Sequence, residues 1–93
     1  MTGLLLVRHM FMSKQVFSII VPDLGDGIDK VEIALWHKNA GDLVDQDEDV
    51  VELVTDKASF NVPASVGGII KNIYVKEGQE APIGAILADM EQS

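Results

Sequence analysis

Hydrophobic and polar residues alternate along this chain in short runs, which is the period of β-strands. The run V-F-S-I-I-V at 16–21 is rich in β-branched residues and is followed by Pro22. A second run at 31–35 alternates apolar with polar or small residues until Trp36 breaks the phase. Short alternating runs that end at proline or at a turn predict strands. We therefore expect an all-β chain from Val16 onward, without a helix of more than two turns.

A further pair of runs flanks a short polar tip. Residues 50–54 are mostly apolar and β-branched, and residues 60–62 alternate until Pro63 ends the run. The tip at 55–58 has no glycine, so a two-residue primed turn is disfavoured and a longer loop built around a type I turn is expected. Lys57 lies at the apex of this tip, with its side chain in water. From chemistry alone, a solvated turn without function is the alternative interpretation.

The sequence repeats itself at a shift of 37 residues, which places Gly41 on Gly78 and Trp36 on Ile73. The same shift matches Ile33 with Ile70, Val44 with Ala81, Val50 with Leu87 and Leu53 with Met90. Two copies are too few for a solenoid. We expect a flattened β-barrel or sandwich of two antiparallel sheets related by a pseudo-twofold, one sheet from each half, with Lys57 in the hairpin that joins the halves. The phase breaks at Trp36 and Ile73 predict bulges that turn each strand toward the other sheet.

Composition narrows the possible functions. The 93 residues form one domain at most, and with only five aromatic residues the core must be built mainly from Val, Ile, Leu and Ala. Fifteen acidic against seven basic side chains give a net charge of -8, which argues against a nucleic-acid partner and against an anionic membrane surface. The absence of cysteine excludes disulfides, thiolate metal sites and a cysteine nucleophile.

Other polar clusters have ordinary interpretations. Gly25 and Gly27 lack the sequence of a phosphate loop or a calcium loop, so residues 23–29 are expected to form a surface loop. The densest acidic cluster aligns with the turn at 82–84 in the second copy and is either a solvated turn or a divalent-ion site; it comprises Asp42, Asp45, Asp47, Glu48 and Asp49. His37 is expected at the surface or in packing. No pair of nucleophile and base is visible, so we expect no catalytic residue. Of the two interpretations of the acidic cluster we expect the solvated turn, and therefore no metal site.

Several stretches together resemble a known family. The sequence E-L-V-T-D-K-A-S-F-N-V-P-A-S-V-G-G at 52–68 resembles the lipoyl-attachment stretch of the lipoyl domains of 2-oxo acid dehydrogenase acyltransferases. V-P-D-L-G-D-G at 21–27 resembles that family's opening Pro-Asp-Leu-Gly-Glu-Gly, and A-G-D-L-V at 40–44 resembles its Gly-Asp-x-Val turn. Gly41 and Gly68 stand where the family has glycines before and after its lysine. The resemblance covers residues 16–91; Val54 departs from it, since the family usually has Glu there.

The resemblance implies a chemistry and a set of residues. Lipoic acid would be attached to Lys57 in amide linkage, with Asp56 and Ala58 as the flanking turn. The loop near the lysine would help a decarboxylase to recognise its carrier; its residues are Leu24, Gly25, Asp26, Gly27 and Ile28. The domain would be a non-catalytic swinging-arm carrier, and its parent chain a dihydrolipoyl acyltransferase.

The implied partners are those of a 2-oxo acid dehydrogenase complex. They are a lipoate ligase or lipoyltransferase, a thiamine-dependent 2-oxo acid decarboxylase, an acyltransferase core and the flavoprotein dihydrolipoyl dehydrogenase. The expected location is the bacterial cytoplasm or the mitochondrial matrix. We expect the acidic surface, including Asp45, Asp47 and Asp49, to steer encounters with these partners.

Presentation, rather than the chemistry of the amine, should select Lys57. The remaining lysines of the strand-forming region are expected within strands or at their ends; they are Lys30, Lys38, Lys71 and Lys76.

Two other carriers remain as alternatives. One is the biotinyl carrier domain of a biotin-dependent carboxylase, a family that sets its lysine between two methionines, where this chain has Asp56 and Ala58. The other is the lipoylated H protein of glycine cleavage, which is longer and ends in a helix. Along the chain we expect residues 1–15 to be an extension that is disordered or vector-derived, residues 16–91 to form the carrier domain, and residues 92–93 to begin a linker.

Overall fold

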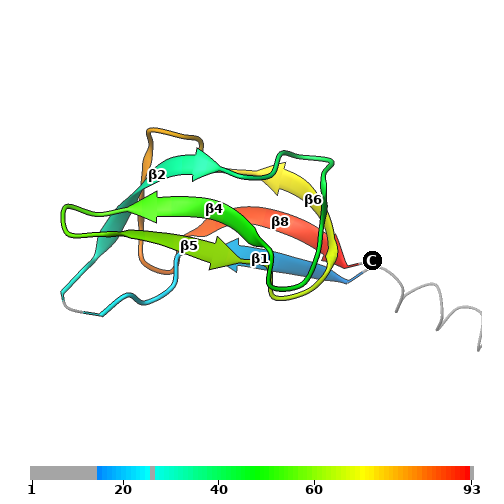
Figure 1. The fold of residues 1–93 in the computed structure, drawn as a ribbon, viewed down its shortest axis with the longest axis horizontal. Helices are drawn as coiled ribbons and strands as arrows, with labels where there is room; N and C mark the ends of the chain where they lie inside the picture. The colour runs from blue at the N-terminus through cyan, green and yellow to red at the C-terminus, as the bar shows by residue number, and fades with distance from the viewer. Residues whose placement is uncertain (1–14, 26, 93) are drawn as a thin grey trace, which may run out of the picture.

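A computed structural model describes residues 15–25 and 27–92 and folds them into eight β-strands (Figure 1). The strands are β1 Val16–Ile20, β2 Lys30–Trp36, β3 Leu43–Val44, β4 Asp49–Val54, β5 Ser59–Pro63, β6 Gly68–Ile73, β7 Glu80–Pro82 and β8 Ile86–Gln92. The described residues contain no helix, as the alternating pattern predicts. The expected extension at 1–15 lies outside the described residues except for Gln15, and the expected linker start at 92–93 is described only at Gln92.

The strands form two antiparallel sheets, in the orders β1-β8-β6-β3 and β5-β4-β2-β7. They make a flattened sandwich, which confirms the predicted fold class. The prediction that each half supplies its own sheet was wrong, because each sheet takes two strands from each half. The chain passes to the other sheet after almost every strand. Within the described residues, the hairpin between β4 and β5 is the one connection that stays in a single sheet.

The predicted internal repeat is present in the backbone hydrogen bonds. The amide of Gly41 donates to the carbonyl of Ile70 at 2.7 Å, and the amide of Gly78 donates to the carbonyl of Ile33 at 2.8 Å. These two bonds are related by the 37-residue shift that the sequence shows. The same shift relates the amide of His37, which donates to Val50, to the amide of Tyr74, which donates to Leu87. The halves are therefore equivalent in pairing as well as in sequence.

The predicted bulges occur, but two residues earlier than expected. The register shifts between Ile33 and Leu35 in β2 and between Ile70 and Asn72 in β6, rather than at Trp36 and Ile73. An inserted residue reverses the alternation of every side chain that follows it, so the pattern looks broken only downstream of the bulge itself.

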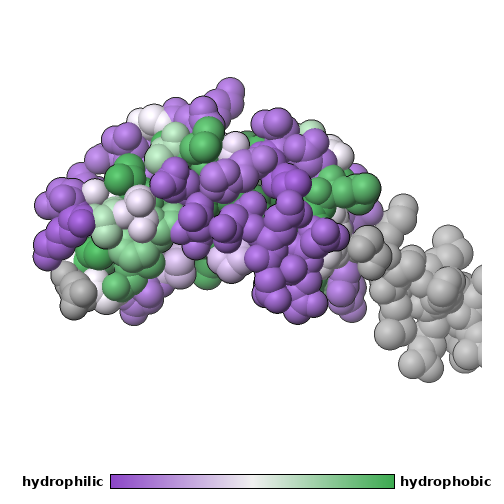
Figure 2. Space-filling model, viewed as in Figure 1, coloured by the Kyte–Doolittle hydropathy of each residue, from purple (hydrophilic) through white to green (hydrophobic). Residues whose placement is uncertain are grey.

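The core lies between the sheets and is built from aliphatic side chains and one methionine. The central strands β4 and β8 begin with the same order of buried and half-buried positions, as their equivalence requires. Burying one such aliphatic side chain contributes roughly 1.5–3 kcal/mol. Gly68 keeps β6 close to β8, because a Cβ at this position would collide with the carbonyl oxygen of Glu91. No polar or charged side chain is buried among the described residues, so any chemistry must come from the surface, much of which is hydrophilic on the face drawn in Figure 2.

Candidate functional site

Lys57 lies at the tip of the β4–β5 hairpin, at the opposite end of the sandwich from the start of β1 and the end of β8 (Figure 1). The strand ladder continues to the pair Val54 and Ser59, after which the amide of Thr55 donates to the carbonyl of Ala58 at 2.8 Å. Asp56 and Lys57 thus form a two-residue tip. Among the described non-glycine residues, Asp47 alone has a positive φ, so neither Asp56 nor Lys57 has one. A primed turn is therefore excluded, as the absence of glycine predicts.

The hydroxyl of Thr55 organises this tip, which the sequence interpretation missed. Its oxygen accepts hydrogen bonds from the amide of Lys57 at 3.2 Å and from the amide of Ala58 at 3.1 Å. The hydroxyl donates to the carbonyl of Ala58 at 3.2 Å. A threonine two residues before the apex is a known turn signal, because its hydroxyl can bond to nearby backbone amides. That signal was available in the sequence.

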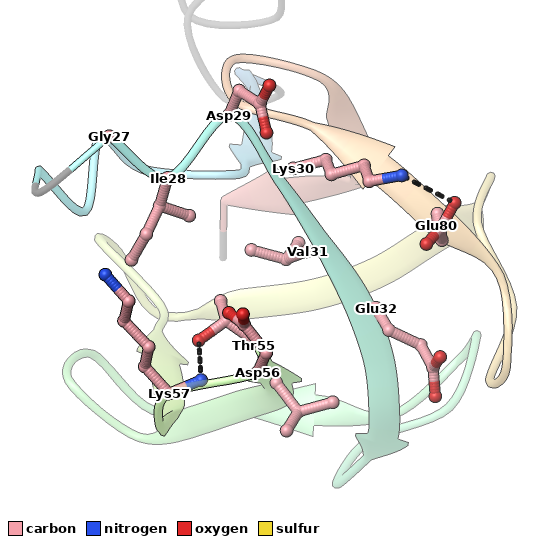
Figure 3. A pocket seen from close by; sticks show the side chains of 11 residues that line it. Gly27, Ile28, Asp29, Lys30, Val31, Glu32, Thr55, Asp56, Lys57 and Glu80 are labelled. Carbon is pink, nitrogen blue, oxygen red and sulfur yellow. Dashed lines mark hydrogen bonds and ion pairs between the residues drawn. The ribbon is translucent and has the colours of Figure 1, made fainter.

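An open groove of about 600 Å³ lies beside the tip (Figure 3). Lys57 and Asp56 form part of its wall, and so do Gly27 and Ile28 of the loop between β1 and β2. Figure 3 shows the side chains of Lys57 and Ile28 directed toward one another. Segments about 30 residues apart in the sequence therefore meet at the predicted attachment site.

The remaining predicted site residues divide into three groups. Leu24 is half-buried and packs against the core, and the carbonyl of Gly25 accepts a hydrogen bond from the amide of Ile28 at 3.0 Å, so both support the loop without lining the groove. Ala58 is exposed and belongs to the turn but not to the groove. Asp26 lies outside the described residues.

The groove carries mixed charge with an acidic excess. Its carboxylates belong to Asp29, Glu32, Asp56 and Glu80, and its cations to Lys30 and Lys57. Lys30 pairs with Glu80 at 3.5 Å. The other ion pair of the described residues joins Lys38 to Glu48 at 2.9 Å, so Lys57 takes part in neither. The side chain of Lys57 is exposed.

The other described lysines are placed differently. Lys30 and Lys71 lie on strands, and Lys38 is held by its ion pair just after β2. Lys76 differs from the expectation, since it lies in the exposed connection between β6 and β7 and not at a strand end. Its amide donates to Oε1 of Gln79 at 2.7 Å. Lys57 and Lys76 are therefore both exposed in connections between strands. They differ in that Lys57 lies in a hairpin whose two strands pair in the same sheet, whereas Lys76 lies in a connection between the two sheets.

Most of the acidic cluster lies between β3 and the first residue of β4, far from Lys57, whereas Asp42 belongs to the turn before β3, where its carboxylate accepts a hydrogen bond from the amide of Asn39 at 2.8 Å. The amide of Asp45 donates to a carboxylate oxygen of Glu48 at 3.0 Å, and the amide of Glu48 returns a bond to the carbonyl of Asp45 at 3.1 Å. The bond from the Asp45 amide, followed by the contact with Lys38, lowers the pKa of Glu48, and the same contact raises the pKa of Lys38. No group of three or more potential ligands among the described residues is arranged to hold a metal ion.

His37 is exposed, and its Nε2 lies 2.9 Å from Oδ1 of Asn61 on the outer face of one sheet. None of the described segments forms a helix that is long and apolar enough to cross a membrane.

Comparison with known proteins identifies the class to which this fold and lysine hairpin belong. The model of the Biotin_lipoyl family, described as "Biotin-requiring enzyme", matches residues 18–90. The chain therefore belongs to the family of biotin- and lipoyl-bearing domains.

Its relatives lie on the lipoyl side of that family. The chain is 32% identical over 75 residues to the dihydrolipoyllysine-residue acetyltransferase component of the pyruvate dehydrogenase complex of Staphylococcus aureus, which covers 81% of this chain and 17% of that protein. It is 38% identical over 73 residues to the lipoamide acyltransferase component of the branched-chain alpha-keto acid dehydrogenase complex of Pseudomonas aeruginosa, covering 78% of this chain and 17% of that protein. The chain thus spans about a sixth of the length of these relatives.

A similar solved structure is also a lipoyl domain. The lipoyl domain of the 2-oxoglutarate dehydrogenase complex of Azotobacter vinelandii superposes with a TM-score of 0.66 at 33% identity, covering 78% of this chain and 92% of that chain. The chain is a lipoyl domain, which favours the lipoyl interpretation over the biotinyl one.

Proposed function

We propose that Lys57 carries lipoic acid in amide linkage and that the domain transports acyl groups and electrons between the active sites of a 2-oxo acid dehydrogenase complex. The observation that supports this most directly is the position of Lys57 in a lipoyl domain. Among residues 15–25 and 27–92, its exposed amine lies outside both ion pairs and at the tip of the one hairpin that stays within a sheet. The hairpin holds this exposed amine at one end of the sandwich, beside the groove, where a modifying enzyme has access to it.

The attachment step needs an enzyme and an activated donor. A lysine ammonium must lose a proton before its nitrogen can attack, and the described groove offers no buried base. A lipoate ligase or lipoyltransferase must therefore remove one proton before the nitrogen attacks the lipoyl carbonyl carbon. The activating group then leaves with the electron pair of its bond to that carbon, and a second proton leaves the nitrogen as the amide forms. This chain contributes the positioned amine.

Lys57 would hold the lipoyl group, which would supply a disulfide able to carry an acyl group and two electrons between the decarboxylase, the acyltransferase core with its coenzyme A, and dihydrolipoyl dehydrogenase. The domain itself is a carrier without catalytic residues in this proposal. A tether of this kind raises the effective concentration of the intermediate at each site without tight binding.

Recognition by the decarboxylase must use folded surface, because the lipoyl arm is the same in every complex. Gly27 and Ile28 support this role, since they share the groove with Lys57. Leu24 and Gly25 support it indirectly by holding the loop in place. The bacterial origin of the relatives named above supports the bacterial cytoplasm as the location, rather than the mitochondrial matrix.

The test of this function is the intact mass of the chain after expression with a lipoate ligase and lipoic acid, and separately with a biotin ligase and biotin. Lipoyl, biotinyl and unmodified chains differ in mass. We expect full conversion to the lipoyl form and none to the biotinyl form. A biotinylated chain, or a chain that stays unmodified under both conditions, would overturn the proposal.

The identity of the 2-oxo acid is tested separately. The lipoylated domain is offered to pyruvate, 2-oxoglutarate and branched-chain decarboxylases, each with its own substrate, and reductive acylation is compared with that of free lipoamide. We expect one decarboxylase to acylate the domain much faster than the other two and much faster than free lipoamide. Equal rates with all three, or none above free lipoamide, would count against a dedicated carrier.

A further inference from the structure

We propose that Thr55 is a positioning residue for the modification of Lys57: its hydroxyl fixes the backbone of the two-residue tip so that the amine is presented in one orientation to the lipoate-attaching enzyme. This inference rests on the proposed function and adds to it a residue whose side chain does not itself react. It is drawn from the hydrogen bonds of the tip and from the comparison of the two halves of the molecule.

One hydroxyl serves three hydrogen bonds at the tip. It accepts from the amides of Lys57 and Ala58, at 3.2 and 3.1 Å, and donates to the carbonyl of Ala58 at 3.2 Å. Thr55 is half-buried, whereas the residues that follow it in the tip are exposed. The hydroxyl therefore links the exposed backbone of the lysine to the half-buried end of β4.

The second half of the molecule shows that the sheet does not need this hydroxyl. The 37-residue shift places Thr55 on Gln92. The amide of Gln92 donates to the carbonyl of Gln15 at 2.8 Å, the same length as the bond from the Thr55 amide to Ala58. Gln15 and Gln92 are the first and last described residues, so no hairpin turn joins them as the tip joins Thr55 to Ala58. The shared ladder bond forms with either side chain, so the bonds of the Thr55 hydroxyl are specific to the end that carries the lysine.

The expected consequence is kinetic. Without the hydroxyl, water can bond to the exposed amides of the tip, so little stability should be lost. The tip would then sample several orientations, and a misplacement of about 1 Å in a reacting group can cost up to roughly 100-fold in rate. The enzyme would still bind the folded strands β4 and β5 of the hairpin. We therefore expect kcat for lipoylation to fall more than KM changes.

The experiment compares three variants of the full chain in lipoylation by a lipoate ligase with lipoic acid and ATP. Thr55→Val keeps the shape and removes the hydroxyl, Thr55→Ser keeps the hydroxyl, and Ser59→Ala removes a nearby hydroxyl that makes none of the turn bonds. We expect kcat to fall about tenfold or more for Thr55→Val. Thr55→Ser should stay within about threefold of wild type and Ser59→Ala should match it, since both keep the bonds of the tip.

A second measurement does not depend on any variant. In the unmodified wild-type domain, amide hydrogen exchange should be slower at Lys57 and Ala58, whose amides bond to the hydroxyl, than at Asp56. Equal, fast exchange at all three amides would overturn the inference. So would lipoylation of Thr55→Val at the wild-type rate, or an equal loss in Thr55→Val and Thr55→Ser.

The outcomes separate this inference from the function on which it rests. If wild-type protein takes up no lipoate, the proposed function fails. If wild-type protein and Thr55→Val are modified equally fast, the function stands and the role of Thr55 is refuted.

Discussion

Asp47 and Gly84 occupy equivalent positions in the two halves and share a left-handed backbone, with φ of 70° and 87°. The amide of Asp47 donates to the carbonyl of Ala64 at 2.8 Å, and the amide of Gly84 donates to the carbonyl of Val21 at 2.9 Å. The turn thus requires a positive φ in both copies. One half meets this requirement with glycine and the other with aspartate, a residue that tolerates the left-handed region better than most.

Substitutions at Gly84 should test this equivalence. A Cβ at Gly84 has no atom within 4 Å, so any loss of stability must come from the backbone conformation. We expect Gly84→Val to cost about 2 kcal/mol or more, and Gly84→Asp to cost about 1 kcal/mol or less, as Asp47 suggests. Urea denaturation of the two variants measures the difference. Equal losses would show that the two turns are not equivalent.

Glu48 should make stability dependent on pH in the acid range. Its pKa lies below the ordinary value of 4.5 in the folded chain, first because of the bond from the Asp45 amide and then because of Lys38. A carboxyl group whose pKa is lowered by folding stabilises the folded state at any pH above its ordinary pKa. This contribution is lost as the pH falls through the pKa of the folded state. Glu48→Gln should therefore be less stable than wild type at neutral pH, and the difference should shrink below about pH 4.

Thermal melts of both proteins from pH 3 to 7 measure this, with Glu32→Gln as a control, since Glu32 accepts neither of these bonds. A difference between Glu48→Gln and wild type that stays constant over that range would contradict the assignment.

Ile28 should matter for acylation and not for lipoylation. Its side chain lies beside Lys57 in the groove and covers part of the surface that a decarboxylase would meet. We expect Ile28→Ala to lower kcat/KM of reductive acylation about tenfold, the effect of losing an apolar contact worth roughly 1–2 kcal/mol. Uptake of lipoate should be nearly unchanged. Ile86→Ala is the matched control, because Ile86 is an exposed isoleucine on β8 that lies outside the groove. An equal effect of both variants would argue against recognition by this loop.

The salt dependence of acylation should come from the carboxylates of the groove. The six residues of β4 separate the acidic turn at Asp45, Asp47 and Asp49 from the lysine hairpin by roughly 20 Å. Charges at that distance are largely screened, because the Debye length is about 8 Å at physiological ionic strength. Neutralising Asp29, Asp56 and Glu80 should flatten the dependence of the association rate on salt. Neutralising the three aspartates of the turn should change it less; a larger effect there would show that the whole acidic surface steers the encounter, as the sequence suggested.

The sequence predicted the strands and the repeat better than it predicted their assembly. Alternation located the runs around Val16, Val31 and Val50, and the 37-residue shift revealed two equivalent halves. Neither the alternation nor the repeat indicated which strands pair, because any strand with one buried face can fit into either sheet. The mixing of strands from both halves in each sheet therefore needed the structure.

The flanking residues of Lys57 predicted it as the attachment lysine, but the sequence did not predict the surroundings of this lysine. Hydrophobic periodicity says little about exposed polar positions, so the role of the Thr55 hydroxyl and the acids around the groove were missed. The left-handed backbone of Asp47 was missed for a related reason: the second copy has glycine at this position, but an aspartate by itself does not reveal its φ.

The most direct test of the account is a map of the modified residue. The chain is lipoylated to completion by a lipoate ligase, digested and analysed by tandem mass spectrometry, alongside Lys57→Arg and Lys76→Arg. Lys76 is the matched control, because it is also an exposed lysine in a connection between strands. We predict lipoate on Lys57 in wild type and in Lys76→Arg, and none in Lys57→Arg. Lipoate on any other lysine, or uptake by Lys57→Arg, would contradict the claim that the β4–β5 hairpin selects Lys57.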